Sequence, residues 1–391
     1  MAKAEGIEVS IAVADAVMLA DADVVAAYPI TPQTHIVEHL AELVNNGELT
    51  ASYIPVESEH SAMSACLGSS AVGARTFTAS ASQGLELMHE VLFVASAMRL
   101  PIVMAVANRA LSAPISIWGD HSDAMATRDT GWIQIFVENG QEAVDHTICA
   151  FRIAEDNRVL LPVMIHMDGF HLTHMVEPII LPEQSEVDAF LPDYHFPLAL
   201  DPEKPVTMGA FASPAIYTEV KYAQDQNLRA AKDVILECWQ EFGKKFQRHY
   251  SPIETYHSQG AKTVLLTMGS YSETAMVAVD KMRSEGQDVG LIKLRLWRPF
   301  PYAELREAVK DAETLVVLDR ALSFGGPGGP VCSEIKAALY NQEKKPKVVG
   351  FVGGLGGRAI SPSGFADMVN DGIKIAGTGS RQEYEMFEVR E

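Results

Sequence analysis

The feature that most limits how this chain can fold is a repeated alternation of short apolar runs with amphipathic segments. Runs typical of strands lie at Val24–Tyr28, Ser52–Val56, Thr76–Ala79, Ile102–Ala107 and Leu160–His166. Helical spacing follows or precedes them at Val9–Leu19, His35–Val44, from about His60, and at Gln83–Met98. Strands that alternate with helices form parallel sheets covered by helices. We therefore predict an α/β fold built on a doubly wound parallel sheet.

A second alternating block begins near Lys262 and is shorter than the first. Its apolar runs are TVLLTM, GLIKLRLW, TLVVLD and KVVGFVGG. Between the blocks the pattern loosens into a proline-rich stretch and a polar helix near Val220–Phe246, as expected of a connecting segment on a surface. A chain of 391 residues is long enough for more than one core. We predict a first domain at 1–180, a connecting segment at 181–258 and a smaller α/β domain at 259–391.

Charge and cysteine usage exclude several classes of protein. The formal net charge of −20 repels phosphate backbones, so we expect no nucleic-acid partner. No apolar run is long enough to span a bilayer and the N-terminus does not resemble a signal peptide, so we expect a cytoplasmic protein that binds no membrane. The four cysteines never form CxxC, and the spacing of His166, Asp168, His171 and His174 matches no zinc motif. We predict no metal ligand in this chain.

Six segments carry a specific resemblance because they occur in one order at natural spacings. They are YPITPQT, VESEHSAMSA, FTASASQGLELM, ANRALSAPISIWGDHSD, HMDGFHLTH and RLWRPFP. Together they are similar to α subunits of pyruvate:ferredoxin oxidoreductases, within the 2-oxoacid:ferredoxin oxidoreductase family. The resemblance covers nearly the whole chain. It implies a pyrimidine-binding thiamine diphosphate domain at 1–180 and a transketolase C-terminal-like domain at 259–391.

The resemblance implies a multi-subunit enzyme that converts pyruvate to acetyl-CoA and CO2 with electrons passed to ferredoxin, or the reverse. The expected partners are β-, γ- and δ-type subunits, with pyruvate and coenzyme A as substrates. The GDG-type magnesium segment of thiamine diphosphate enzymes is missing, and the only similar string is GDH at Gly119–His121. We therefore expect a shared cofactor, with Mg²⁺ and the iron–sulfur clusters on partner subunits. Ferredoxins are acidic and should dock on another subunit than this acidic chain.

Glu59 matches the family glutamate that hydrogen-bonds the aminopyrimidine ring of thiamine diphosphate, so the resemblance implies a catalytic and cofactor-binding role. That chemistry needs a carboxyl group shielded by apolar neighbours, which Ile54, Val56 and Met63 could supply. The simpler alternative is a glutamate that only complements the dipole of a helix start. Glu57, two positions away, is the rival for the role.

Thr31 and Arg109 match family residues that contact the substrate. The resemblance implies that the Thr31 hydroxyl touches the substrate carboxylate, although Thr31-Pro32 also fits a helix cap followed by a first-turn proline. Arg109 follows an apolar strand, where a guanidinium group could pair with both oxygens of a 2-oxoacid carboxylate. The alternative for Arg109 is an ordinary surface arginine.

Weaker motifs complete the candidate site. Ser82 and Gln83, in the SQG turn, and Pro29, in YPITP, resemble positions that contact the cofactor, although a capped helix explains SQG equally well. The glycine-rich loops at Gly325–Gly329 and Gly353–Gly357 lack a GxGxxG pattern and are interpreted as plain loops.

Two alternatives to a pyruvate enzyme stay open. A sister enzyme would act on 2-oxoisovalerate or 2-oxoglutarate, and pocket volume, which a sequence does not give, would decide between them. A non-catalytic scaffold subunit would be expected to lack Glu59 or Arg109, and both are present.

Overall fold

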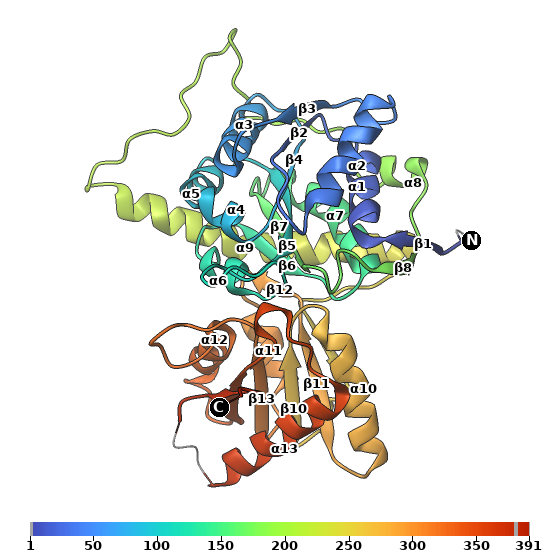
Figure 1. The fold of residues 1–391 in the computed structure, drawn as a ribbon. Coiled ribbons are helices and arrows are strands. Elements are labelled where there is room, and N and C mark those ends of the chain that lie inside the picture. The colour runs from blue at the N-terminus through green and yellow to red at the C-terminus, as the bar shows by residue number, and fades with distance from the viewer. Residues whose placement is uncertain (1–2, 379–381, 391) are drawn as a thin grey trace.

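The computed structural model describes residues 3–378 and 382–390, which build two open sheets stacked end to end (Figure 1). The larger sheet has the strand order β12-β6-β7-β5-β4-β2-β3. Its strands are β2 (Val24–Ala27), β3 (Ser52–Pro55), β4 (Thr76–Ser80), β5 (Ile102–Asn108), β6 (Ile133–Phe136), β7 (Val163–Asp168) and β12 (Leu296–Arg298). All pairs in it are parallel except β12 with β6. The predicted α/β parallel-sheet fold is confirmed.

Helices cover both faces of the larger sheet. One face carries α1 (Val9–Leu19), α2 (Thr34–Asn45), α7 (Gly140–Ala154) and α9 (Tyr217–Phe246). The other carries α3 (Glu59–Ala71), α4 (Ser82–Leu87) and α5 (His89–Ala97). The short helix α6 (Ser122–Ala126) follows β5, and β1 (Glu5–Glu8) pairs with β8 (Val176–Ile179) beside α1. The sheet is therefore buried on both sides, as its continuous apolar strands require.

The segment between the two sheets contributes to the larger core. After α8 (Gln184–Asp188) the chain runs out from the body in a long extended excursion before it returns as α9 (Figure 1). The buried face of α9, which includes Ile235, Trp239 and Phe242, packs into the apolar core that α1 and α7 share. The polar helix of the connecting segment thus covers one face of the larger sheet.

The smaller sheet has the order β15-β14-β13-β10-β11-β9. Its strands are β9 (Ile253–Tyr256), β10 (Thr263–Thr267), β11 (Val289–Leu294), β13 (Thr314–Asp319), β14 (Lys347–Val352) and β15 (Glu385–Met386). Its helices are α10 (Tyr271–Ser284), α11 (Tyr302–Ala308), α12 (Pro330–Leu339) and α13 (Pro362–Thr378), with the short 3₁₀ helix η1 (Leu355–Gly357) after β14. Among the residues that the structure describes, no helix combines the length and the apolar character that a membrane span needs.

Three local predictions are wrong. The run GLIKLRLW is two strands, because Arg295 turns away to Glu142 and Glu254 and the chain passes from the smaller sheet (β11) to the larger one (β12). The predicted helix Gln83–Met98 is interrupted at Met88, which separates α4 from α5. Thr31 is not a helix cap, because Ile30–Gln33 forms a turn closed by Gln33 N–H to the Ile30 carbonyl, and α2 begins at Thr34.

The carboxyl ends of the two sheets face each other through a buried ion pair. Asp168, at the end of β7, contacts Arg320, which follows β13, and accepts the backbone N–H and the hydroxyl of Ser270 at 2.8 and 2.7 Å. His121 Nε2 lies 3.1 Å from the same carboxylate. Burial alone would raise the pKa of Asp168, but Arg320 and His121 outweigh it and hold that pKa well below its ordinary value.

Replacing Arg320 with Met should therefore destabilise the protein strongly. The change leaves Asp168 buried without its countercharge, and breaking a buried pair in this way costs about 3–5 kcal/mol. We expect this decrease in the free energy of unfolding when both proteins are unfolded with urea at pH 7. The difference between wild type and variant should shrink as the pH falls below the ordinary aspartate pKa of about 3.9, because the wild type then progressively loses the stabilisation that ionised Asp168 provides. Arg158→Met is the matched control, because Arg158 forms an exposed pair with Asp156. Equal losses in both variants would refute the argument.

Candidate active site

The residues predicted to form a site lie at one edge of the larger sheet. Thr31 follows β2, Glu59 opens α3 after β3, Ser82 opens α4 after β4, and Arg109 follows β5. These strands are neighbours in the sheet and run parallel, so their carboxyl ends form one edge. This is where open α/β sheets bind ligands.

Glu59 is buried and packs against the backbone of Gly84. Ser58 caps α3 by accepting the Ser61 N–H, and the next residue, Glu59, is only 6% exposed. A methyl group built on Gly84 would lie 2.5 Å from Glu59 Oε1 and 2.7 Å from Ser80 Oγ. Gly84 thus leaves the space in which the carboxyl group sits. Within the described part of the chain, no hydrogen bond to this carboxyl group is formed, so it keeps its capacity for a ligand.

The rival carboxylate has a different environment. Glu57 is exposed, and its carboxylate accepts a hydrogen bond from the Ser61 hydroxyl, which lowers the pKa of Glu57. By contrast, the shielding residues predicted for Glu59 all belong to the apolar cluster beneath α3 and α4, where Met63 is fully buried and Ile54 and Val56 are half-buried. The geometry favours Glu59 over Glu57 for a shielded acid.

Ser82 and Gln83 lie together at the start of α4. The Ser82 hydroxyl is 2.6 Å from Gln83 Oε1 and 2.8 Å from the Ala110 carbonyl oxygen. Gln83 Nε2 is buried and has no hydrogen-bond partner among the residues described. A buried donor without an acceptor costs free energy. That amide therefore suits a ligand that brings an acceptor.

Arg109 and Thr31 are in direct contact. Arg109 Nη1 donates to the Thr31 carbonyl at 3.0 Å and Nε donates to the Ser116 carbonyl at 2.8 Å. The residue is 6% exposed, and burial lowers the pKa of its guanidinium group although Asp123 opposes this. Its side chain forms no ion pair within the described residues. A nearly buried cation held only by carbonyl groups suits an anionic ligand.

Asp123, which we did not predict, holds these loops together. Its Oδ2 accepts the backbone N–H groups of Ser82 and Arg109, both at 2.9 Å, and its Oδ1 accepts Asn108 Nδ2 at 2.8 Å. Burial raises the pKa of Asp123 to about 7, against these donors. Asp123 ends the segment ANRALSAPISIWGDHSD, which is part of the family resemblance, but nothing in that segment indicates that Asp123 reaches back to the ends of β4 and β5.

Pro29 is the predicted residue that the structure links least to the others. It is exposed in the loop after β2. Hydrogen bonds join Arg109 to Thr31 and Ser82 to Gln83. Asp123 connects these two pairs by accepting the backbone N–H groups of Ser82 and Arg109. Glu59 lies against Gly84, which belongs to α4. The site is thus connected except at Pro29.

The donors at this edge suit an aminopyrimidine ring better than a diphosphate group. A carboxyl group and an unpartnered amide can pair with ring nitrogens and an exocyclic amine. Two groups of side chains in the described residues could gather around a cation, Glu8 with His35 and His174, and Glu138 with Glu142 and Glu254. Neither contains a site residue named above, and the second is neutralised by Lys293 and Arg295. Within the described residues, this edge therefore holds no cluster of three or more acidic, histidine or cysteine side chains of the kind that could surround a cation.

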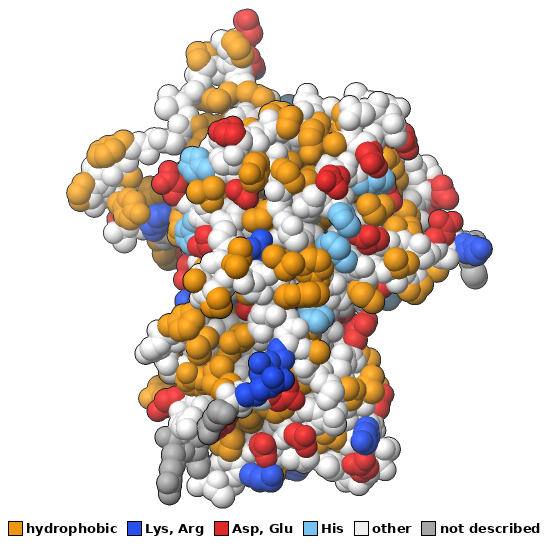
Figure 2. All heavy atoms as spheres, viewed as in Figure 1, with side chains coloured by type: hydrophobic (Ala, Val, Ile, Leu, Met, Phe, Trp, Pro, Cys, Tyr) orange, Lys and Arg blue, Asp and Glu red, His pale blue; other side chains and the backbone are white. Residues whose placement is uncertain are grey.

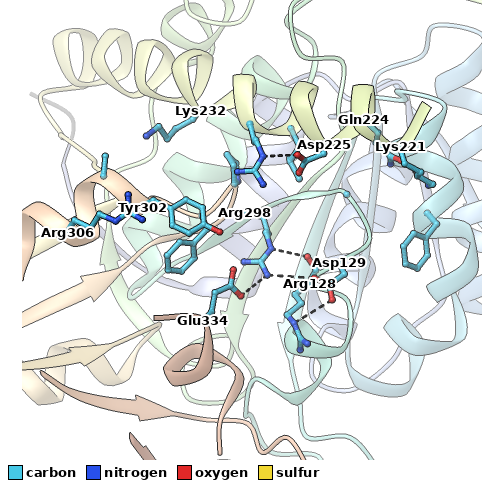
Figure 3. Close-up of a pocket in the computed structure, with 17 residues that line it drawn as sticks. Arg128, Asp129, Lys221, Gln224, Asp225, Lys232, Arg298, Tyr302, Arg306 and Glu334 are labelled. Atoms are coloured by element: carbon cyan, nitrogen blue, oxygen red, sulfur yellow. Dashed lines mark hydrogen bonds and ion pairs between the residues drawn. The ribbon is translucent and has the colours of Figure 1, made fainter. Parts of the chain in front are cut away.

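A cavity of about 670 Å³ lies elsewhere, between the first half of α9 and the segment Arg298–Arg306 (Figure 3). Charged side chains around it pair with one another, as Arg298 does with Glu334 at 2.9 Å and Arg229 with Asp225 at 2.7 Å. None of the predicted site residues lines it. The candidate site is therefore an open edge of the sheet, separate from this cavity.

Comparison with known proteins shows that this α/β fold belongs to the class of thiamine diphosphate-binding proteins. Residues 15–239 match the family described as pyruvate flavodoxin/ferredoxin oxidoreductase, thiamine diphosphate-binding, and residues 261–365 match core domain II of pyruvate:ferredoxin oxidoreductase. The chain belongs to this pyruvate:ferredoxin oxidoreductase family.

Several relatives are similar over most of their length. The chain is 51% identical to pyruvate synthase subunit PorA of Methanocaldococcus jannaschii, covering 92% of each chain. It is 51% identical to PorA of Pyrococcus furiosus, over 90% of this chain and 88% of that one. It is 45% identical to ketoisovalerate oxidoreductase subunit VorA of Pyrococcus abyssi, over 94% and 93%.

Solved structures support the fold. The 2-oxoglutarate:ferredoxin oxidoreductase of Magnetococcus marinus aligns with a TM-score of 0.72 at 19% identity, covering 95% of this chain and 66% of that one. A split-gene transketolase aligns with a TM-score of 0.55 at 13% identity, covering 95% of this chain and 100% of that one.

Proposed function

We propose that this chain is the catalytic α subunit of a pyruvate synthase, which interconverts pyruvate and coenzyme A with acetyl-CoA and CO2 and exchanges electrons with ferredoxin. The observation that carries the proposal is that one sheet edge presents both a shielded acid, Glu59, and a nearly buried cation, Arg109, each without a charged partner among the described residues. The family match and the PorA relatives supply the reaction.

Each residue has a part in this proposal. When bound, thiamine diphosphate supplies the electron sink for breaking the bond between the keto carbon and the carboxylate. Glu59 holds a proton shared with the aminopyrimidine ring, and the Gln83 amide donates to the same cofactor. Pro29 and Ser82 line the cofactor. Arg109 and Thr31 bind and orient the pyruvate carboxylate. Asp123 holds the Ser82 and Arg109 backbones in fixed positions relative to each other.

Partner subunits complete the site in this proposal. The Mg²⁺ ion of the diphosphate and the iron–sulfur clusters belong to β-, γ- and δ-type subunits, and ferredoxin docks on one of them. The missing GDG segment and the scattered cysteines support this arrangement. Next to Arg109, the loop 112–118 exposes Ile115 and Trp118 to 77% and 49%. Apolar side chains gather across the middle of the face seen in Figure 2. Exposed apolar surface of this kind is typical of contacts with other chains.

The proposal keeps a pyrimidine-binding part at 1–180 and a transketolase C-terminal-like part at 259–391, joined by 181–258. We also propose a cytoplasmic location for the enzyme. A sister enzyme for 2-oxoisovalerate is the second candidate, because the VorA relative is nearly as similar as the PorA relatives. A scaffold subunit is disfavoured by the complete Glu59 and Arg109 environments.

Dye reduction by the reconstituted complex tests the proposal. With coenzyme A and thiamine diphosphate, we expect reduction of a viologen dye with pyruvate to exceed that with 2-oxoglutarate or 2-oxoisovalerate, and no turnover by this chain alone. Preference for 2-oxoisovalerate would move the assignment to the sister enzyme. Turnover by the isolated chain would refute a shared site.

Replacing Arg109 with Ala should lower kcat/KM for pyruvate in that complex. Loss of a hydrogen bond to a charged group costs about 1.5–3 kcal/mol, which corresponds to a roughly 10- to 100-fold decrease. Arg109→Lys should recover only part of the loss, because an ammonium group does not reproduce the planar fork. Arg152→Ala, which removes an outer ion pair with Glu241, is the control and should behave as wild type. Unchanged kinetics in Arg109→Ala would place Arg109 outside the substrate site.

A further inference from the structure

One cluster of metal-ligating side chains has no part in the proposed reaction. Glu8 ends β1, His35 lies in the first turn of α2, and His174 lies in the loop between β7 and β8. One possible ligand atom from each lies within 4.8 Å of the other two. Three separate elements therefore bring two imidazole groups and one carboxylate to the same point.

The ligands are already oriented by contacts around them. His35 Nδ1 is 2.6 Å from Glu8 Oε1, and the His35 and His174 rings lie 4.6 Å apart. His174 Nδ1 is 2.8 Å from Thr173 Oγ1, and that hydroxyl is fixed because Thr173 is fully buried and accepts the Phe170 N–H at 3.0 Å. The remaining His174 nitrogen, Nε2, is thus left for a ligand. Metal-bound histidines commonly have their other nitrogen held by such a partner.

We propose that Glu8, His35 and His174 bind a divalent transition-metal ion of the zinc type, with water as a further ligand. Two histidines and one carboxylate form a ligand set that such ions prefer. Tetrahedral coordination at Zn–N distances of about 2.0–2.1 Å places ligand atoms about 3.3 Å apart. Atoms that are now up to 4.8 Å apart must therefore approach, and His35 Nδ1 and Glu8 Oε1, now 2.6 Å apart, must separate slightly. The His35 and Glu8 side chains can make that adjustment, because they are 42% and 26% exposed.

The expected consequence is structural. A bound ion would tie the β1–β8 pair to the start of α2, which follows the Thr31 turn by only a few residues. The proposal departs from the prediction of no metal ligand in this chain, which rested on the spacing within HMDGFHLTH alone, because Glu8 and His35 are distant from that segment in the chain. Of the other histidines in that segment, His171 lies 3.0 Å from the Gly357 carbonyl and His166 lies 3.2 Å from Asn108 Nδ2.

Metal binding by the full chain, after treatment with a chelator, tests the inference without any turnover assay. We expect Zn²⁺ to bind at one ion per chain in calorimetry and to raise Tm, and Co²⁺ to give the visible absorption of a site with nitrogen and oxygen ligands. His174→Ala and His35→Ala should each weaken binding at least about 10-fold and reduce the rise in Tm, in line with the loss of a ligand.

Two further variants keep the test decisive. Glu8→Gln preserves shape and should weaken binding without unfolding the chain, which covers the case in which a histidine variant misfolds. His39→Ala is the matched control, because His39 lies on the same helix and pairs with Asp15 at 2.9 Å outside the cluster. Absence of Zn²⁺ binding, or equal binding by wild type, His174→Ala and Glu8→Gln, would overturn the inference. Neither result depends on whether the chain acts on pyruvate.

Discussion

Replacing Glu59 with Gln is expected to lower kcat of the reconstituted complex by about 10²- to 10⁴-fold, the usual contribution of general acid–base assistance. Gln keeps the size of the side chain but cannot share a proton with the cofactor ring. Glu59 is only 6% exposed and lies against Gly84, so its position leaves little room for water to take over that role. Turnover with saturating thiamine diphosphate, pyruvate and coenzyme A measures the loss.

Glu57→Gln is the matched control for this prediction. Glu57 is two residues away, carries the same group and is exposed. It should keep a near-normal kcat. A large loss in Glu57→Gln with none in Glu59→Gln would transfer the proposed role to Glu57.

Replacing Gly84 with Ala is expected to reduce activity by about 10²-fold while leaving the fold intact. The added methyl group would lie 2.5 Å from Glu59 Oε1 and 2.7 Å from Ser80 Oγ, so the carboxyl group must move. The contacted atoms, which also include Glu59 Cδ at 2.8 Å, all belong to side chains and not to the backbone, so the backbone can keep its course while these side chains shift. Displacing a catalytic group by about 1 Å can cost about 10²-fold in rate. Kinetics of the complex and thermal unfolding of the chain measure the two effects separately.

A loss of activity in Gly84→Ala would not be explained by a weakened helix. Ala is favoured over Gly inside a helix by about 1 kcal/mol, so Gly84→Ala is not expected to weaken α4 as a helix. Gly68→Ala in α3 is the control, because a methyl group there meets nothing within 4 Å. It should retain activity and gain stability. Normal turnover in Gly84→Ala would show that the Glu59 carboxyl group does not need this position.

Much of the fold could be predicted because strand and helix periodicity are local properties. The predicted helix Val9–Leu19 has the same bounds as α1. The four strands predicted to precede the site residues are β2, β3, β4 and β5, and all four are neighbours in the larger sheet. Long-range contacts decided the rest. Arg295 divides GLIKLRLW because Glu142 and Glu254 attract it across the two sheets, and no pattern within that run reveals those partners.

Long-range contacts also limited how much of the candidate site could be predicted from the sequence. The strand ends and the family resemblance pointed to Glu59, Thr31, Arg109, Ser82 and Gln83, and the structure brings most of them together. Asp123 and Gly84 were not predicted, because their importance lies in contacts with residues 14 to 41 positions away or in space left for a carboxyl group. A glycine that leaves room for a side chain of another helix is indistinguishable in sequence from one that only permits a turn.

The central claim, that Glu59 activates thiamine diphosphate at an edge shared with a partner subunit, is tested most directly by hydrogen exchange at C2 of the bound cofactor. The exchange of that hydrogen for deuterium can be followed by quenched-flow NMR in the reconstituted complex without any substrate. We predict fast exchange in the wild type and exchange slower by about 10²- to 10⁴-fold in Glu59→Gln with the cofactor still bound. Equal exchange rates in the two complexes would contradict the account.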